Sequence, residues 1–60
     1  METYYGVIYF KNGRIVKTGG FSGPGAARSC EIRTAQMFEQ YKKTAISAHF
    51  EPSRYEVKCK

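Results

Sequence analysis

The sequence predicts an α+β domain in which a small antiparallel sheet of three strands packs one face against a single helix, in the order ββαβ. Two segments rich in aromatic and β-branched residues flank an Asn-Gly pair, a helical apolar stripe follows, and the last segment alternates between apolar and charged residues. With 42% hydrophobic and 15% aromatic residues, residues 1–60 are expected to form one small domain. A chain of 60 residues is too short for a Rossmann unit or a barrel.

The first two strands are expected over residues 3–10 and 14–18, where β-branched and aromatic side chains dominate. Asn12-Gly13 lies between them and predicts a two-residue type I′ turn, because that turn needs a positive φ at both central residues. The segment is therefore expected to form a β-hairpin.

A two-residue turn also fixes which residues of the hairpin share a face. It pairs Phe10 with Ile15 and Ile8 with Lys17. The members of the first face are Tyr4, Ile8, Phe10, Ile15 and Lys17, and those of the second are Tyr5, Val7, Tyr9, Val16 and Thr18. Both faces carry large apolar side chains, and the sequence leaves open which of them the helix covers.

Residues 19–25 are rich in glycine and are expected to form a loop. A helix is expected after it, with Ser29 as its N-cap. Its apolar stripe consists of Cys30, Thr34, Met37, Phe38, Tyr41 and Ala45. A third strand over residues 28–33, followed by a shorter helix, is the alternative.

The stretch 45–53 fits two interpretations, a helix that continues to about Ala48 or a strand in which Ile46, Ala48 and Phe50 alternate. A turn is expected over residues 51–54. The last strand is expected over residues 54–59. Its inward side chains are Tyr55, Val57 and Cys59, and its outward ones are Arg54, Glu56 and Lys58.

The chain is basic, with ten Lys and Arg against five acidic residues, all of them Glu. Cations near aromatic side chains on a sheet can track phosphates while bases stack on the rings. The candidate nucleic-acid contacts are Lys11, Arg14, Lys17, Arg54 and Lys58. The alternative is that this charge only keeps the surface solvated.

The hairpin face opposite the helix is a candidate surface for a protein partner. Its residues would be Tyr4, Ile8, Phe10 and Ile15, an apolar patch that is large for a monomer. If the helix covers this face instead, the residues offered to a partner are Tyr5, Tyr9 and Val16. The partner is either an unidentified protein or a second copy of the chain, since small domains often complete their core by association. The alternative is that Phe21 or the segment 46–50 covers this patch.

No catalytic, cofactor-binding or metal-binding residues are predicted. The single histidine, His49, has no evident acid or nucleophile partner beyond a distant Cys30 or Cys59, and these three residues lack the spacing of a metal site. Two cysteines are too few for a disulfide scaffold, so reduced thiols and a cytoplasmic location are expected. No apolar run is long enough to span a membrane.

The expected sheet-and-helix plan is similar in architecture to small phage-encoded accessory proteins and to the sheet-based arm-binding domain of tyrosine recombinases. No motif carries a single residue across from either group. We therefore expect a small non-catalytic accessory or regulatory protein of the phage or prophage type that acts through protein contacts. A nucleic-acid-binding module with a basic, aromatic sheet face is the alternative, and an enzyme that uses Cys and His is a distant third.

Overall fold

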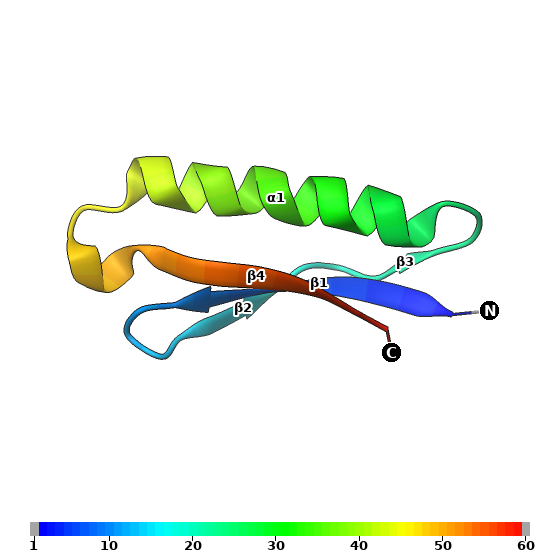
Figure 1. The fold of residues 1–60 in the computed structure, drawn as a ribbon, viewed down its shortest axis with the longest axis horizontal. Coiled ribbons are helices and arrows are strands. Elements are labelled where there is room, and N and C mark those ends of the chain that lie inside the picture. Colours follow the sequence, from blue (N-terminus) through cyan, green and yellow to red (C-terminus); the bar gives the residue numbers. More distant parts are fainter. Residues whose placement is uncertain (1, 60) are drawn as a thin grey trace.

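The central strand of the computed structural model, β1 (Thr3–Phe10), organises the whole domain. The structure describes residues 2–59, with the side chain of His49 excluded. The other elements are β2 (Ile15–Lys17), β3 (Phe21–Ser22), the helix α1 (Ala26–Thr44), the 3₁₀ turn η1 (Ala48–Phe50) and β4 (Pro52–Cys59). The helix lies along one face of the sheet, and both ends of the described chain lie at the same end of the molecule (Figure 1).

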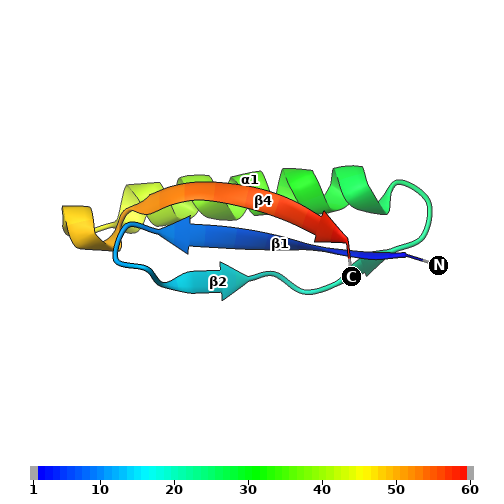
Figure 2. The same ribbon diagram turned by 60° about the horizontal axis from the view of Figure 1, so that its bottom comes forward.

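All strand pairs in the sheet are antiparallel, and all include β1. On one side β1 pairs with β4, and on the other side it pairs with β2 along one half and with β3 along the other (Figure 2). The predicted α+β class, with one helix on a small antiparallel sheet, is confirmed. The sheet has four strands rather than three, because the loop predicted over residues 19–25 contains β3.

The hairpin forms, but its predicted register is wrong by one residue. Its loop has three residues: the N–H of Phe10 bonds the carbonyl of Arg14, and Gly13 alone of the two predicted turn residues has a positive φ, 90°. The Asn12 side chain accepts a bond from the N–H of Arg14 over 2.9 Å. Such a loop is a type I turn followed by a left-handed glycine. It pairs Ile8 with Val16.

This slip moves every side chain of β2 to the opposite face of the sheet. Val16 now shares a face with Ile8, while Ile15 and Lys17 share a face with Tyr9 and Val7. The predicted grouping of Ile15 and Lys17 with the even-numbered residues of β1 is therefore corrected.

The helix begins four residues earlier than predicted. Gly25, with a φ of 73°, is its N-cap, and its carbonyl accepts the first helical bond, from the N–H of Ser29. Ser29, the predicted N-cap, therefore lies inside the helix. The alternative strand over residues 28–33 is wrong, because these residues are helical.

The core lies between α1 and the even-numbered side of β1. Ile8, Cys30 and Thr34 are fully buried there. Gly6 explains why the helix comes so close: a Cβ at this position would lie 1.8 Å from the Oγ1 of Thr34. A glycine in a strand permits such an approach, and the Thr34 hydroxyl donates to the carbonyl of Cys30 over 2.7 Å.

The helix ends at Thr44, so residues 45–50 neither continue it nor form a strand. These residues form a loop and the short turn η1 before β4 begins at Pro52. The alternation predicted for the last strand holds where it pairs with β1, because Tyr55 lies beside Ile8 and Val57 beside Gly6 on the helix side. Tyr55 packs on Phe38 there, with ring centroids 5.1 Å apart.

Candidate functional site

One face of the sheet has α1 packed on it, and we call it the helix-covered face. The other, which we call the open face, has no helix on it in the described part of the chain (Figure 1). The strand registers place the following residues on the open face: Tyr5, Val7 and Tyr9 of β1, Ile15 and Lys17 of β2, and Arg54, Glu56 and Lys58 of β4.

Two tyrosine rings of the open face each lie beneath a cation. The guanidinium of Arg54 is 4.0 Å from the ring centroid of Tyr9, and the ammonium of Lys17 is 5.9 Å from that of Tyr5. A cation over an aromatic ring is attracted to its electron-rich face by about 0.5–1 kcal/mol when exposed to water. The strands therefore hold aromatic and cationic groups together in pairs.

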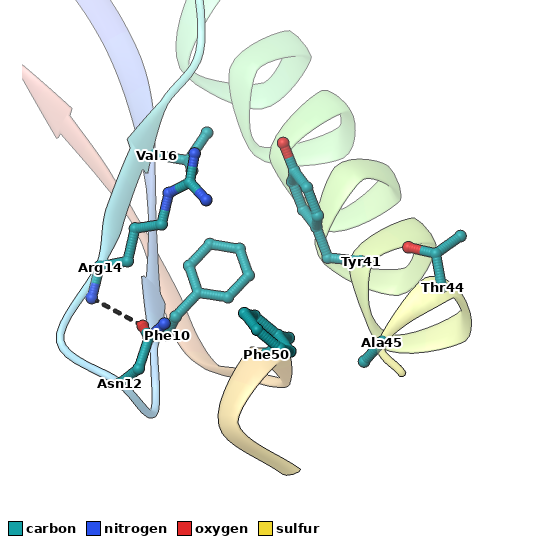
Figure 3. Close-up of a pocket in the computed structure, with 8 residues that line it drawn as sticks. All are labelled: Phe10, Asn12, Arg14, Val16, Tyr41, Thr44, Ala45 and Phe50. Carbon is teal, nitrogen blue, oxygen red and sulfur yellow. Dashed lines mark hydrogen bonds between the residues drawn. The ribbon is translucent and has the colours of Figure 1, made fainter. Parts of the chain in front are cut away.

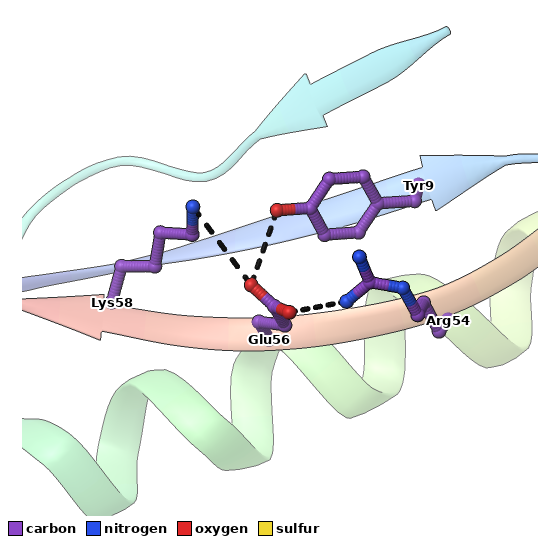
Figure 4. A network of polar contacts seen from close by, with 4 residues as sticks. All are labelled: Tyr9, Arg54, Glu56 and Lys58. Atoms are coloured by element: carbon purple, nitrogen blue, oxygen red, sulfur yellow. Dashed lines mark hydrogen bonds and ion pairs between the residues drawn. The ribbon is translucent and has the colours of Figure 1, made fainter. Parts of the chain in front are cut away.

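The carboxylate of Glu56 links the cations of β4 to β1 (Figure 4). It accepts a hydrogen bond of 3.1 Å from the hydroxyl of Tyr9 and another from Arg54, and the ammonium of Lys58 lies 3.9 Å from it. The bonds from Arg54 and Tyr9 lower the pKa of Glu56. The Tyr9 hydroxyl and the Glu56 charge raise the pKa of Lys58, so that both groups are ionised at neutral pH.

Val7 lies in the middle of the open face and is nevertheless only 2% exposed. No helix covers it in the described chain, so its neighbours on the sheet must exclude water from it. Long side chains can cover apolar surface with their stems and rings while their polar ends stay in water. The open face is therefore polar and aromatic on its outside, with three cations and one carboxylate among its described residues.

The four residues predicted to form a partner surface do not share one face. Tyr4, Ile8 and Phe10 lie on the helix-covered face, where Ile8 is fully buried and Phe10 meets the ring of Tyr41 at 5.2 Å. Ile15 lies on the open face and is half exposed. The one-residue slip of the hairpin separates it from the other three.

The five predicted nucleic-acid contacts fall into two groups. Lys17, Arg54 and Lys58 share the open face. Lys11 and Arg14 lie at the hairpin loop, and Lys11 is in an ion pair with Glu51 at 3.1 Å. Tyr5 and Tyr9, which complete the cationic group, were offered by the sequence only as the alternative partner surface and not as nucleic-acid contacts. Gly6 could have decided between the two hairpin faces, because a glycine in a strand marks the face that a helix approaches. Tyr5 and Tyr9 alternate with Gly6 and therefore lie on the opposite face.

A small hollow of about 170 Å³ lies at the hairpin end of the molecule (Figure 3). Phe10, Tyr41 and Phe50 form its apolar part, and Arg14 lies at its rim. Pockets that hold organic ligands usually enclose about 300–1,000 Å³. This hollow is too small to be a candidate ligand site.

The thiol and carboxylate side chains are dispersed over the described residues. These residues include no cluster of three or more His, Cys, Asp or Glu side chains. Cys30 is buried between helix and sheet, whereas Cys59 is exposed at the end of β4, and no disulfide links them. The predicted alternative of a Cys–His pair involves the side chain of His49, which lies outside the described part of the chain.

No protein-family model, curated protein or solved structure matches the chain. None of the helices in the described residues is long and apolar enough to cross a membrane. The chemistry of the open face is therefore inferred from its own residues.

Proposed function

We propose that the protein is a non-catalytic nucleic-acid-binding module that holds single strands on its open face. The observation that carries this proposal is the gathering of Tyr5 and Tyr9 with Lys17, Arg54 and Lys58 on one uncovered side of the sheet. Aromatic rings on a sheet stack unpaired bases, and neighbouring cations neutralise the phosphates between them.

The spacing of the two tyrosines favours a single strand over a duplex. Tyr5 and Tyr9 are four residues apart on β1, which corresponds to about 13 Å along a strand. Two stacking positions this far apart can each take a base from an extended chain when the cation over the ring moves to a phosphate or itself stacks on the base, whereas bases inside a duplex are stacked on each other and offer no free face. Arg54 lies over Tyr9 with much of its side chain exposed, and an arginine plane also stacks on bases.

The test is fluorescence anisotropy with labelled single-stranded and duplex oligonucleotides at 50 and 200 mM salt. Three phosphate contacts on a single strand predict an affinity roughly 20-fold weaker at the higher salt, because bound counterions are released on binding. We expect Lys17→Glu and Tyr5→Ala to weaken binding about tenfold or more each, the latter through loss of one stacked base.

Lys43→Glu is the matched control, because it reverses the same charge at an exposed position on the helix rather than on the open face. It is expected to change the affinity only slightly. The absence of binding at 50 mM salt would overturn the proposal. An equal effect of Lys43→Glu and Lys17→Glu would also overturn it, since the attraction would then depend on net charge alone.

Contact with a protein is the second candidate function. It is favoured by an observation away from the open face: β4 pairs with β1 on one side, and no other described strand pairs with it on its outer side.

A further inference from the structure

The strand that offers an edge to a partner is β4. β1 has neighbours on both sides, so its backbone groups are already paired. β4 pairs with β1 alone among the described strands, and its part from Arg54 onward forms a continuous edge. The opposite edge is divided between β2 and β3, which have three and two residues.

The backbone bonds of the hairpin show which groups of β4 point outward. On the side of β2, the carbonyl of Gly6 accepts a bond from the N–H of Thr18, and the N–H of Phe10 donates to the carbonyl of Arg14. Because successive residues of a strand bond in opposite directions, Val7 and Tyr9 must bond β4 instead.

The residues of β4 opposite Val7 and Tyr9 are Glu56 and Arg54. The N–H and C=O groups of the intervening residues, Tyr55 and Val57, therefore point away from β1. Unpaired groups of this kind form a template for another strand.

A strip of the helix that contains both apolar and charged side chains borders the same edge. A hollow beside β4 is lined by Tyr55 together with Ala27, Arg28, Glu31, Ile32 and Ala35 of α1. Ile32 is 51% exposed although it is a large apolar residue. The edge thus offers both backbone groups and apolar surface to a partner.

A second copy of the chain would fit both features at once. The helix packs against β1 and β4 to a similar extent, so its axis lies midway between these two strands. The twofold axis of a β4–β4 pair lies half a strand spacing beyond β4, which places the helix axis about one strand spacing, 4.8 Å, from the twofold axis. The helices of two copies would then lie about 10 Å apart, at the upper end of the distance at which helices pack. The small side chains of Ala27 and Ala35 allow such an approach.

The charges and the regularity of β4 together select the register of this pairing. Outward-facing residues must lie opposite each other, so a twofold axis passes through Tyr55, Glu56 or Val57. An axis through Glu56 sets two carboxylates opposite each other, which is unfavourable. An axis through Tyr55 sets Arg54 opposite Glu56, but it also brings in Ser53, where the ladder with β1 is irregular. An axis through Val57 uses only regular strand and sets Glu56 opposite Lys58 of the second copy.

We propose that the chain forms a homodimer through antiparallel pairing of two β4 strands about Val57, with Glu56 opposite Lys58 of the second copy and Ile32 of each helix in the interface. The pairing does not depend on nucleic acid. It joins two sheets into one, with both open faces on the same side.

The first test measures mass by sedimentation equilibrium over a range of concentrations, without nucleic acid. The wild type is expected to associate to two copies. Lys58→Glu sets two like charges opposite each other at both ends of the pair and is expected to raise the dissociation constant about tenfold.

The double variant Glu56→Lys/Lys58→Glu exchanges the two charges and is expected to restore the dimer. Restoration supports the register about Val57. Under a register about Tyr55 the new Lys would face Arg54, so failure to restore would overturn the proposed pairing.

The second test compares Ile32→Lys with Ile46→Lys. Both isoleucines are exposed, Ile46 to 88%, so both variants are expected to fold, which circular dichroism checks. Ile32→Lys should weaken the dimer at least tenfold, while Ile46→Lys should leave it unchanged. A wild type that stays monomeric at millimolar concentration would overturn the proposal, as would equal effects of the two variants. Neither result would affect the nucleic-acid test on Lys17.

Discussion

On the helix-covered face Ile8 is fully buried beneath α1, whereas on the open face its neighbour Val7 is almost as deeply buried with no helix above it in the described chain. The first face excludes water with a second layer of structure. The second does so with the long side chains of its own strands. The comparison shows that a sheet face without a helix can bury an apolar side chain and still carry charged groups and aromatic rings on its surface.

The largest expected loss of stability comes from a cavity on the helix-covered face, between β1 and α1. Ile8→Ala removes a fully buried side chain and leaves a cavity, which costs about 2–5 kcal/mol. A 60-residue domain has a total unfolding free energy of only about 3–9 kcal/mol, so this variant is expected to lose roughly half of its stability or more. Urea denaturation followed by circular dichroism measures it.

The matched control for Ile8→Ala is Ile46→Ala, the same change at a residue that is mostly exposed. Its unfolding free energy is expected to stay within about 0.5 kcal/mol of the wild type. Equal losses at Ile8 and Ile46 would contradict the position of the core.

The next effect comes from forcing the helix away from the sheet. In Gly6→Ala the new methyl group meets the side chain of Thr34, and overpacking of this kind costs about 1–3 kcal/mol or more. Gly19→Ala is the control, because open space surrounds Gly19. The double variant Gly6→Ala/Thr34→Gly should recover part of the loss in a thermal melt, and no recovery would speak against this contact.

The smallest effect concerns the polar contacts of the open face. Hydrogen bonds from Arg54 and Tyr9 lower the pKa of Glu56 from its ordinary value of 4.5, so the folded state favours the ionised carboxylate. Its contribution to stability is therefore present above pH 4.5 and is lost as the pH falls through the lowered pKa. The difference in urea midpoint between wild type and Glu56→Gln should be positive at pH 7 and shrink on acidification. A difference that grows at low pH would contradict the network.

The strands and the helix could be predicted from the sequence because each depends on a local pattern. The hairpin register could not be predicted, because it depends on one backbone dihedral angle, the φ of Asn12. Asn12-Gly13 is compatible with two turns, and only Gly13 adopts the left-handed conformation, with the Asn12 side chain bonding the next strand instead. The strand β3 was missed for a different reason: it consists of two residues and pairs with the distant residues Thr3 and Tyr4.

The candidate site was predicted in part. The outward direction of Arg54 and Lys58 followed from the alternation of the last strand, and the structure agrees. Their meeting with Lys17 and Tyr9 depends on the pairing of β4 with β1 and on the slip of the hairpin, neither of which is a local property. Under the predicted register Lys17 would lie beneath the helix with Ile8.

The two edges of the sheet differ in a way that limits assembly. β4 is a continuous edge, while the other edge is interrupted between β2 and β3, where the hydroxyl of Thr18 accepts the N–H of Gly6 in place of a backbone carbonyl. A sheet with two open edges can add copies without end and grow into a filament. Because the described sheet has a single continuous edge, chains that pair through β4 would stop at two copies and leave no end from which a fibre could grow.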